Sequence, residues 1–274
     1  MHRQLKKILD TDSDESVMTF TENKELMELA AQINRLLEKQ LKTKADYRRY
    51  EMASKRMLSN ISHDMKTPMT VILGYLEIMR MNGGASPEML EKIQQKAQGL
   101  LALVDQFFTL SKLEAGDMDV ELSRLDMCEV CRETILDFYE MLSEAEFEVE
   151  INVPDTPAYV QGNEDAIQRI VTNLISNVLR YGFAGKYLGI FLRADDSYVY
   201  VDVTDKGQGI DKVYAQSIFD RLFTMEDSRS RKVQGNGLGL TIARNLAWQM
   251  GGDITLESTP HIQTTFTVKL KKSF

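Results

Sequence analysis

The sequence predicts an α+β protein, with a helical hairpin toward the N-terminus and an α/β sandwich toward the C-terminus. Apolar residues recur every three or four positions from about Glu22 to Phe107, which is the spacing of amphipathic helices. After residue 116 the sequence pattern changes, and helical stretches alternate with short runs rich in β-branched and aromatic residues. A length of 274 residues is enough for one large domain or two ordinary ones.

Composition excludes several classes of protein. The hydrophobic content is 43% and the charged content 27%, close to globular averages, so wholesale disorder is excluded. The net charge of −8 argues against direct nucleic-acid binding, which needs a basic face. No apolar stretch approaches the ~18 residues of a membrane-spanning helix, and the first residues do not lead into a signal peptide. Two cysteines cannot form a disulfide framework.

The first long helix is predicted to begin near Glu22, after a polar connector at residues 10–16. Its apolar positions form a coiled-coil-like seam that contains several polar members, so we expect a real but weak helix pairing. The seam positions are Leu26, Leu29, Ile33, Leu36, Gln40, Thr43, Tyr47, Tyr50, Met57 and Ile61. The helical periodicity continues to Met79 and breaks at residues 81–87.

A second helix is predicted to start at Ser86, with serine as N-cap and Pro87 at the first helical position, and to end at Gly116. Two amphipathic helices joined by a short turn form an antiparallel hairpin. A lone hairpin leaves its apolar stripe exposed, so a homodimeric four-helix bundle is the favoured solution. The alternative is a hairpin packed on the C-terminal domain.

The region after residue 116 is predicted to fold as helices on one face of a mixed sheet. Helical stretches are expected at residues 128–143, 164–180 and 238–250. Strands are expected at residues 147–153, 187–193, 198–204, 254–258 and 265–270. Cys128 and Cys131 lie on the first of these helices, where facing the core is favoured over binding a metal.

His63 is the only one of the three histidines with chemically suitable neighbours. A neutral imidazole attacks a phosphoryl group through a ring nitrogen with a free lone pair, and an adjacent carboxylate such as Asp64 can hold the proton on the other nitrogen. Pro68 is expected to interrupt the helix and turn the hydroxyl of Thr67 outward. An ordinary surface histidine is the alternative for a residue of this kind in isolation.

Three strings in the C-terminal region suit a nucleotide. Asn173 and Asn177 are one helical turn apart, so their amide oxygens share a face and could reach one Mg²⁺. Asp205 follows a strand and precedes two glycines, and a buried carboxylate there can accept a hydrogen bond from the exocyclic amine of adenine. Glycines at residues 235–239 open a helix whose N-terminus suits phosphates. Taken alone, each string also has an explanation that involves no ligand. The asparagines could be capping residues, the Asp205 string a hairpin turn, and the last string a glycine-rich hinge.

The segment between the last two strings, residues 218–234, is long and without clear periodicity. It contains Phe219, Phe223, Arg229, Arg231 and Lys232. A loop of this length in a compact domain is often functional, so we expect a lid over the nucleotide.

The string SHDMKTPMTVILGY around His63 resembles the phosphoacceptor box of the sensor histidine kinases of two-component systems. The resemblance implies that His63 is phosphorylated, that Asp64 assists proton removal and that Thr67 serves in dephosphorylating a partner protein. The C-terminal strings, in their order, resemble the N, G1, F and G2 boxes of the catalytic domain of the same family, a GHKL-type ATP-binding fold shared with gyrase and MutL-type ATPases.

This resemblance implies ATP and Mg²⁺ as cofactors, with Asn173 and Asn177 as metal ligands and Asp205 as the adenine contact. It covers residues 56–270. The implied nucleotide-binding residues are Asn173, Asn177, Arg180, Tyr181, Asp205, Gly207, Gly209, Ile210, Arg229, Gly235, Gly237, Leu238 and Gly239.

The sequence departs from the family pattern at a few positions. Arg180 stands where lysine is usual, and Gly182 stands where threonine is common. Thr224 stands where arginine is frequent, so Arg221 or Arg229 is left to supply the phosphate charge. No departure removes a reacting group, so the resemblance still implies activity.

The resemblance predicts three regions: a signal-relay linker helix at residues 1–50, a dimerisation and histidine phosphotransfer domain at 51–116, and a catalytic ATP-binding domain at 117–274. The linker also resembles, more weakly, the second helix of a HAMP module. The chain is therefore expected in the cytoplasm, either as part of a plasma-membrane sensor, which would meet the membrane only through segments absent from this chain, or as a soluble relative.

The favoured function is an ATP-dependent protein-histidine kinase that phosphorylates His63 and passes the phosphoryl group to an aspartate in the receiver domain of a response regulator, which it also dephosphorylates. One alternative is an ATP-hydrolysing conformational switch. Enzymes of that kind carry a glutamate base where this chain has Asn173, and an amide cannot act as a base. The other alternative is an inactive dimeric scaffold.

Overall fold

The computed structural model describes residues 17–18, 21, 23–118, 120–215, 217–220, 223 and 237–273. The chain divides into two compact units, residues 1–60 and 61–274, with the boundary inside the long helix α2 (Lys24–Asn82). The first unit holds the N-terminal part of α2. The second unit holds the helical hairpin and the mixed α/β domain.

The start of α2 is fixed by its local sequence. Asn23 caps the helix, because its side-chain oxygen accepts hydrogen bonds from the backbone N–H groups of Glu25 at 3.0 Å and Leu26 at 3.2 Å. Next to the seam residue Ile33, the side-chain amide of Asn34 accepts a hydrogen bond from the N–H of Val17 and donates one to its carbonyl oxygen. Leu36 is 67% exposed, so this part of the seam is left uncovered in the single chain.

The predicted hairpin is present, but its first helix continues through Pro68, so the expected interruption is wrong. A proline costs a helix one hydrogen bond and some steric strain, and the helical residues on both sides hold the geometry. Helix α3 (Pro87–Ala115) begins as predicted, with the Ser86 side chain accepting a hydrogen bond from the Met89 N–H at 3.2 Å. It ends at Gly116, whose φ of 72° suits glycine.

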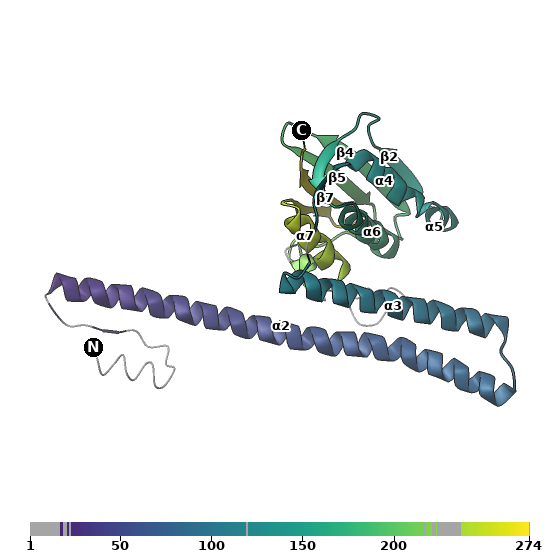
Figure 1. Cartoon of the computed structure of the whole chain (residues 1–274), viewed down its shortest axis with the longest axis horizontal. Helices are drawn as coiled ribbons and strands as arrows, with labels where there is room; N and C mark the ends of the chain where they lie inside the picture. The colour runs from purple at the N-terminus through teal and green to yellow at the C-terminus, as the bar shows by residue number, and fades with distance from the viewer. Residues whose placement is uncertain are drawn as a thin grey trace. The chain divides into compact units, whose positions relative to one another are not determined.

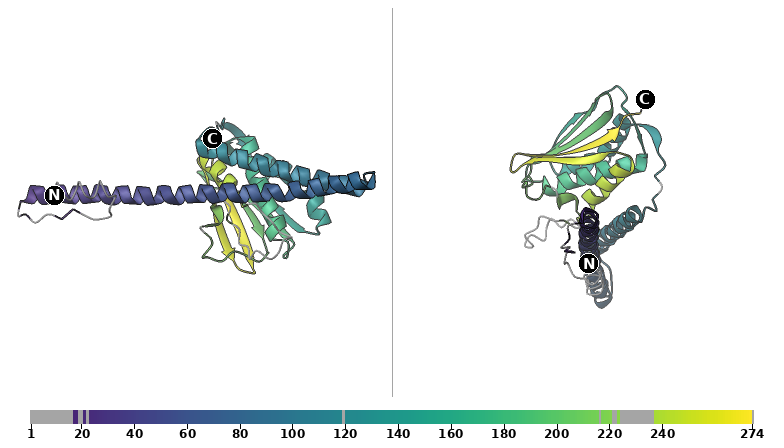
Figure 2. Two further views of the ribbon diagram at one scale, coloured as in Figure 1. Left: turned by 90° about the horizontal axis from the view of Figure 1, so that it is seen from below. Right: turned by 90° about the vertical axis from the view of Figure 1, so that its left-hand side faces the viewer.

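The C-terminal domain contains a five-stranded mixed sheet with strand order β2-β4-β5-β7-β6. Its strands are β2 (Glu148–Asn152), β4 (Tyr187–Ala194), β5 (Tyr198–Asp205), β6 (Asp253–Thr259) and β7 (Gln263–Lys271). The β2–β4 pair is parallel and the other pairs are antiparallel. Helices α4 (Met127–Leu136), α6 (Glu164–Tyr181) and α7 (Gly239–Gln249) lie on one face, which confirms the predicted sandwich (Figures 1 and 2).

The core lies between this helical layer and the inner face of the sheet. Alternate residues of the central strands point inward, as the period of two requires. Residues that are at most 2% exposed include Ile170, Leu174 and Ile175 of α6, Ile242 and Leu246 of α7, and Leu188, Ile190, Val201, Val203, Phe266 and Val268 of the strands. This packing fixes the end of α6 and the start of α7, the two helices that carry the asparagines and the glycines singled out above.

Three details of this domain were not predicted. The single helix expected at residues 128–143 is wrong, because the chain forms α4 and a short helix α5 (Tyr139–Glu144) separated at residues 137–138. Strands β1 (Ser123–Asp126) and β3 (Tyr159–Gly162) form a separate antiparallel pair. Each has only four residues, too few for a periodicity to show. A 3-10 turn, η1 (Ser217–Phe219), precedes α7 in the chain.

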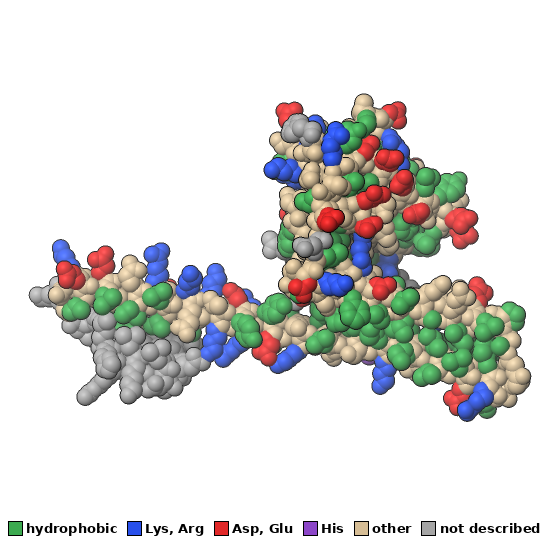
Figure 3. All heavy atoms as spheres, in the orientation of Figure 1, with side chains coloured by type: hydrophobic (Ala, Val, Ile, Leu, Met, Phe, Trp, Pro, Cys, Tyr) green, Lys and Arg blue, Asp and Glu red, His purple; other side chains and the backbone are tan. Residues whose placement is uncertain are grey.

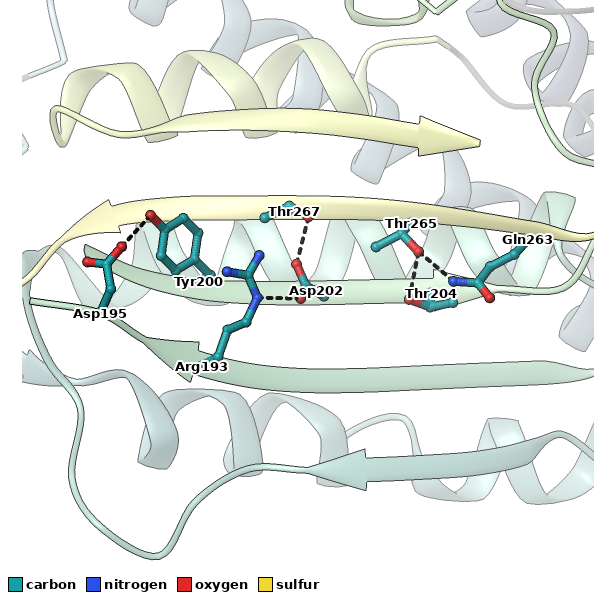
Figure 4. Close-up of polar contacts among 8 residues, drawn as sticks. All are labelled: Arg193, Asp195, Tyr200, Asp202, Thr204, Gln263, Thr265 and Thr267. Atoms are coloured by element: carbon teal, nitrogen blue, oxygen red, sulfur yellow. Dashed lines mark hydrogen bonds and ion pairs between the residues drawn. The ribbon is translucent and has the colours of Figure 1, made fainter. Parts of the chain in front are cut away.

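The outer face of the sheet is polar. Asp202 of β5 accepts hydrogen bonds from Arg193 Nε at 3.1 Å and from Thr267 Oγ1 at 2.6 Å (Figure 4). Tyr200 donates to Asp195 at 2.8 Å, and the hydroxyls of Thr204 and Thr265 meet at 3.0 Å. These contacts stabilise a sheet face that none of the described helices covers.

Cys128 and Cys131 face the core, as predicted, and both are fully buried. Burial raises the pKa of the Cys131 thiol to about 12, so the thiol stays protonated at neutral pH. Among the described residues no helix is long and apolar enough to cross a bilayer.

Candidate functional site

His63 lies on the solvent-facing side of α2. Ile61, two residues earlier, is 4% exposed, and a step of two residues turns the helix by about 200°. The His63 side chain is accordingly 76% exposed. Its Nδ1 lies 3.5 Å from Oδ1 of Asp64, the limit of a hydrogen bond. A proton held on Nδ1 by this contact leaves the lone pair of Nε2 free.

Thr67 lies on the same helix face, four residues after His63. Its hydroxyl donates a hydrogen bond to the His63 backbone carbonyl at 3.2 Å, so the expected outward orientation is wrong. Because α2 remains helical at Thr67, that carbonyl is within reach of the side chain, as is common for threonine in helices. Thr67 is exposed, and its hydroxyl oxygen can still accept a hydrogen bond from another molecule.

A cavity of about 220 Å³ lies beside α6, the loop after β5 and the start of α7. Most of the residues predicted to bind nucleotide line it: Asn173, Asn177, Arg180, Tyr181, Asp205, Gly209, Ile210, Gly237 and Gly239. Four of these come from the last turns of α6, which have one face on the core and the other on the cavity. The structure therefore brings together strings separated by up to about sixty residues of sequence.

Some predicted residues lie elsewhere. Leu238 is fully buried in the core rather than in the cavity wall. Gly207 lies behind Asp205 and donates its N–H to Oδ1 of that residue at 2.8 Å. Arg229 and Gly235 lie outside the described residues, as do Arg221, Thr224, Arg231, Lys232 and most of the expected lid.

Asp205 is the ionisable group of the cavity wall that is most deeply buried. It is 7% exposed, and burial raises the pKa of its carboxyl above the ordinary value, while the hydrogen bond from Gly207 partly opposes that rise. Oδ1 is engaged by Gly207, so Oδ2 is the oxygen left for a ligand. A carboxylate held in this way is an acceptor of fixed direction.

The loop after Asp205 is held in place by β6 and β7. The Ile210 N–H donates to Ser258 Oγ at 2.8 Å, and that hydroxyl lies 3.0 Å from the hydroxyl of Thr264. Gly209 has a φ of 75°, and a side chain there would run into Pro260. Thr264 pairs directly with Asp205 across the sheet and lines the cavity. The sequence alone does not point to this threonine, because strand register has no local sequence signal.

The two asparagines fit a hydrated cation bound with phosphates. The buried Nδ2 of Asn173 has no hydrogen-bond partner in the part of the chain that the structure describes, and as a donor it suits an oxygen acceptor such as a phosphate or a water molecule. A Cβ on Gly239 would lie 3.1 Å from Oδ1 of Asn173, so glycine keeps the space beside that amide open. Amide oxygens are ligands that Mg²⁺ accepts alongside water and phosphate.

Comparison with known proteins agrees with this geometry. Residues 53–116 match the family described as "His Kinase A (phospho-acceptor) domain", and residues 162–273 match "Histidine kinase-, DNA gyrase B-, and HSP90-like ATPase". Sensor histidine kinase YcbM of Bacillus subtilis is 39% identical over 273 residues, covering 98% of this chain and 88% of YcbM. Sensor histidine kinase WalK of the same organism is 31% identical over 79% of this chain, but the match spans only 36% of WalK.

Solved structures show the same fold. Histidine kinase AdeS of Acinetobacter baumannii aligns with a TM-score of 0.63 at 23% identity, covering 77% of this chain and 98% of that one. Histidine kinase ThkA in complex with response regulator protein TrrA aligns with a TM-score of 0.61 at 20% identity, covering 93% of this chain and 69% of that one. With both domain families matched in order, and with YcbM similar over nearly its whole length, the chain belongs to the sensor histidine kinase family.

Proposed function

We propose that this protein transfers the γ-phosphoryl group of ATP to His63 and then to an aspartate of a response regulator. The observation that carries the proposal is the cavity in which the Asp205 carboxylate and the amides of Asn173 and Asn177 converge. It offers one directed acceptor for adenine and a set of neutral oxygen ligands for a metal on the phosphates.

Nucleotide binding is proposed to divide among three elements. Oδ2 of Asp205 accepts the hydrogen bond of the adenine amine. The backbone N–H groups at the start of α7, around Gly237 and Gly239, suit the phosphates because the helix dipole adds partial positive charge there. Asn173 and Asn177 would hold Mg²⁺, which when bound neutralises phosphate charge. Arg180, at the end of α6, would supply a further positive charge.

The chemical step is proposed to use Nε2 of His63. A new bond forms between Nε2 and the γ-phosphorus, and the bond from that phosphorus to the bridging oxygen of ADP breaks. Asp64 accepts the Nδ1 proton as the ring gains positive charge. Because the His63 side chain is largely exposed, a separate protein can reach the phosphorylated ring and accept the phosphoryl group on a carboxylate. The complex of ThkA with its response regulator supports a partner of this class.

The hairpin is proposed to form a homodimeric four-helix bundle. Large apolar side chains of α2 and α3 gather along the hairpin (Figure 3) and are between 43% and 78% exposed in the single chain: Leu58, Met69, Leu73, Leu76, Ile78, Met81, Leu90, Leu101 and Phe108. An exposed apolar surface of this extent indicates a partner. A second copy would present the same stripe and cover it.

Two further assignments belong to the proposal. Thr67 is proposed to orient a water molecule during dephosphorylation of the regulator. The region boundaries predicted above, 1–50, 51–116 and 117–274, are proposed for the linker, phosphotransfer and catalytic regions. Because ATP and a regulator are both cytoplasmic, these regions are proposed to act in the cytoplasm.

The proposal is tested by incubating the full chain with γ-labelled ATP and Mg²⁺. Protein-bound label that is lost in acid and retained in base identifies a phosphoramidate, the product expected on His63. Label stable in acid would indicate a hydroxyl acceptor and contradict the proposal. Release of free phosphate without labelled protein would favour the hydrolytic switch, and absence of nucleotide binding would favour the scaffold.

A further inference from the structure

Ser258 of β6 connects two parts of the cavity wall from behind. It lies directly opposite Thr264 of β7, and Thr264 lies directly opposite Asp205 of β5. Residues that face each other across antiparallel strands project from the same side of the sheet, so the three polar side chains form a row on the inner face. Asp205 and Thr264 are the two members of the row that line the cavity, and both are buried.

The hydroxyl of Ser258 already accepts one hydrogen bond. The backbone N–H of Ile210, in the loop after β5, donates to Ser258 Oγ at 2.8 Å. A hydroxyl group has a single proton to donate, and two acceptors lie near this one. Oγ1 of Thr264 is at 3.0 Å, and the carbonyl oxygen of Gln263 is at 3.4 Å. The contact with Thr264 is the shorter and therefore the stronger hydrogen bond.

The direction of the bond between Ser258 and Thr264 decides what Thr264 can offer a ligand. When Ser258 donates to Thr264, the proton of Thr264 is left for an acceptor in the cavity. In the opposite direction Thr264 uses its proton on Ser258, and Ser258 is left with the weak contact to Gln263. The distances therefore favour a donating Thr264 once an acceptor enters the cavity.

Thr264 lies beside the carboxylate that is proposed to contact the adenine amine. Directly opposed residues of antiparallel strands have Cβ atoms about 4.5–5.5 Å apart, so both side chains can meet neighbouring atoms of one base. In adenine the carbon that carries the amine is bonded to N1, a ring nitrogen that accepts hydrogen bonds. An acceptor at Asp205 and a donor at Thr264 match this edge, directly or through one water molecule. Guanine presents the reverse pattern, an acceptor oxygen followed by a ring N–H.

We propose that Ser258 is a positioning residue for base recognition: by donating to Thr264, it turns the Thr264 hydroxyl into a donor toward N1 of the base. The inference rests on the proposed function, because it assumes that Asp205 contacts the adenine amine. It adds a second point of discrimination, on a ring atom, and assigns its control to a residue that does not itself line the cavity.

The test asks whether the protein distinguishes N1 from a carbon atom. Binding is measured with Mg²⁺ on the full chain by titration calorimetry for ADP and two analogues. In 1-deazaadenosine 5′-diphosphate a C–H replaces N1, and purine riboside 5′-diphosphate lacks the amine. Wild type is expected to prefer ADP at least ~5-fold over each analogue, the contribution of about one hydrogen bond. Ser258→Ala should reduce the preference over the 1-deaza analogue to below ~2-fold and leave the preference over the purine riboside within ~2-fold of wild type.

Three further variants show whether the hydroxyl itself is responsible. Ser258→Thr retains it on a residue suited to strands, so both preferences should be kept. Thr265→Ala removes a hydroxyl from a matching pair on the outer face, where Thr204 and Thr265 also meet at 3.0 Å, and should change neither preference. Ser258→Cys has a similar volume but a much weaker donor, so it should lose the preference as alanine does. It takes the place of Ser258→Ala if that variant does not fold.

A double-mutant cycle with Thr264→Val tests whether Ser258 acts through Thr264. In the Thr264→Val background the donor is gone, so Ser258→Ala should cause no further loss of preference over the 1-deaza analogue. An additive loss, an equal weakening of ADP and the 1-deaza analogue by Ser258→Ala, or a wild type indifferent to N1 would overturn the inference. A wild type indifferent to the amine would instead overturn the adenine contact of the proposed function.

Discussion

The ionisable residues His63, on a helix surface, and Asp205, in the cavity wall, differ in exposure and in how firmly their side chains are held. The His63 side chain is 76% exposed and has one neighbouring carboxylate at the limit of hydrogen bonding. Asp205 is 7% exposed and is held by the Gly207 N–H and by close backbone contacts. One residue is free to turn, and the other is fixed.

This difference follows from what each residue is proposed to do. A phosphoryl carrier has to be reached by two different molecules in turn, the nucleotide and the regulator, so burial would exclude one of them. A group that distinguishes bases has to exchange a hydrogen bond with water for one with the ligand, and it discriminates well only where water cannot replace the ligand. The comparison therefore predicts that substitutions at His63 affect chemistry without binding, and that substitutions at Asp205 affect binding first.

The largest effect is expected at His63. His63→Gln removes the nucleophilic nitrogen and should abolish acid-labile labelling, with a loss of at least ~100-fold, while ADP affinity stays within ~2-fold of wild type. His261→Asn is the matched control, because His261 has a φ of 60° that asparagine tolerates, and it should keep its label. Persistent labelling of His63→Gln would show that another residue carries the phosphate.

A smaller loss is expected at the buried carboxylate. Asp205→Asn replaces an acceptor oxygen with a donor facing the adenine amine, so ATP affinity should fall by ~1–3 kcal/mol, about 5- to 150-fold. The far-UV circular dichroism spectrum should be unchanged. Asp202→Asn is the control, since it makes the same change on the outer face of the same strand (Figure 4) and should leave ATP affinity as it is. Wild-type affinity in Asp205→Asn would contradict the adenine site.

A third prediction concerns Thr67, on the exposed helix surface beside His63, and its part in regulator dephosphorylation. Thr67→Ala should leave autophosphorylation intact and slow regulator dephosphorylation at least ~10-fold, which corresponds to about 1.4 kcal/mol. Thr70→Ala is a close control, because its hydroxyl makes the same kind of bond to a carbonyl four residues earlier, at 2.8 Å. Equal slowing by both variants would mean that helix geometry, rather than the Thr67 hydroxyl, sets the rate.

The smallest effect concerns stability. Burial raises the pKa of Asp205, so the folded state binds its proton more tightly and the stability contributed by this group is lost as pH rises through the folded pKa. Asp205→Asn should therefore raise the Tm at pH 7, because the amide has no buried charge to desolvate. The difference should vanish below the ordinary aspartate value of 3.8. A lower Tm at pH 7 would mean that the charged form is stabilised instead.

Long, periodic elements were predictable from the sequence, and short ones were not. Helix α6 and the strands β4 and β5 lie within one or two residues of their predicted bounds, because apolar spacing over many residues is a strong signal. Strands β1 and β3 were missed for lack of length, and the continuation of α2 through Pro68 went against the local preference of the residue. The short strands gave no local signal to detect, whereas at Pro68 the helical residues on both sides outweighed the local preference.

The sequence by itself determined which chemical groups this protein has and which of them share a helix face, His63 with Thr67 and Asn173 with Asn177. It also determined that Asp64 is the chain neighbour of His63 and that glycines follow Asp205. Those facts depend on residue type and on the helical repeat alone. Only the tertiary structure decided that Thr264 pairs with Asp205, that Leu238 is buried in the core, and that Gly182 lies against the Asp205 carboxyl. Strand register and backbone approach arise from packing between distant segments, and no local pattern encodes them.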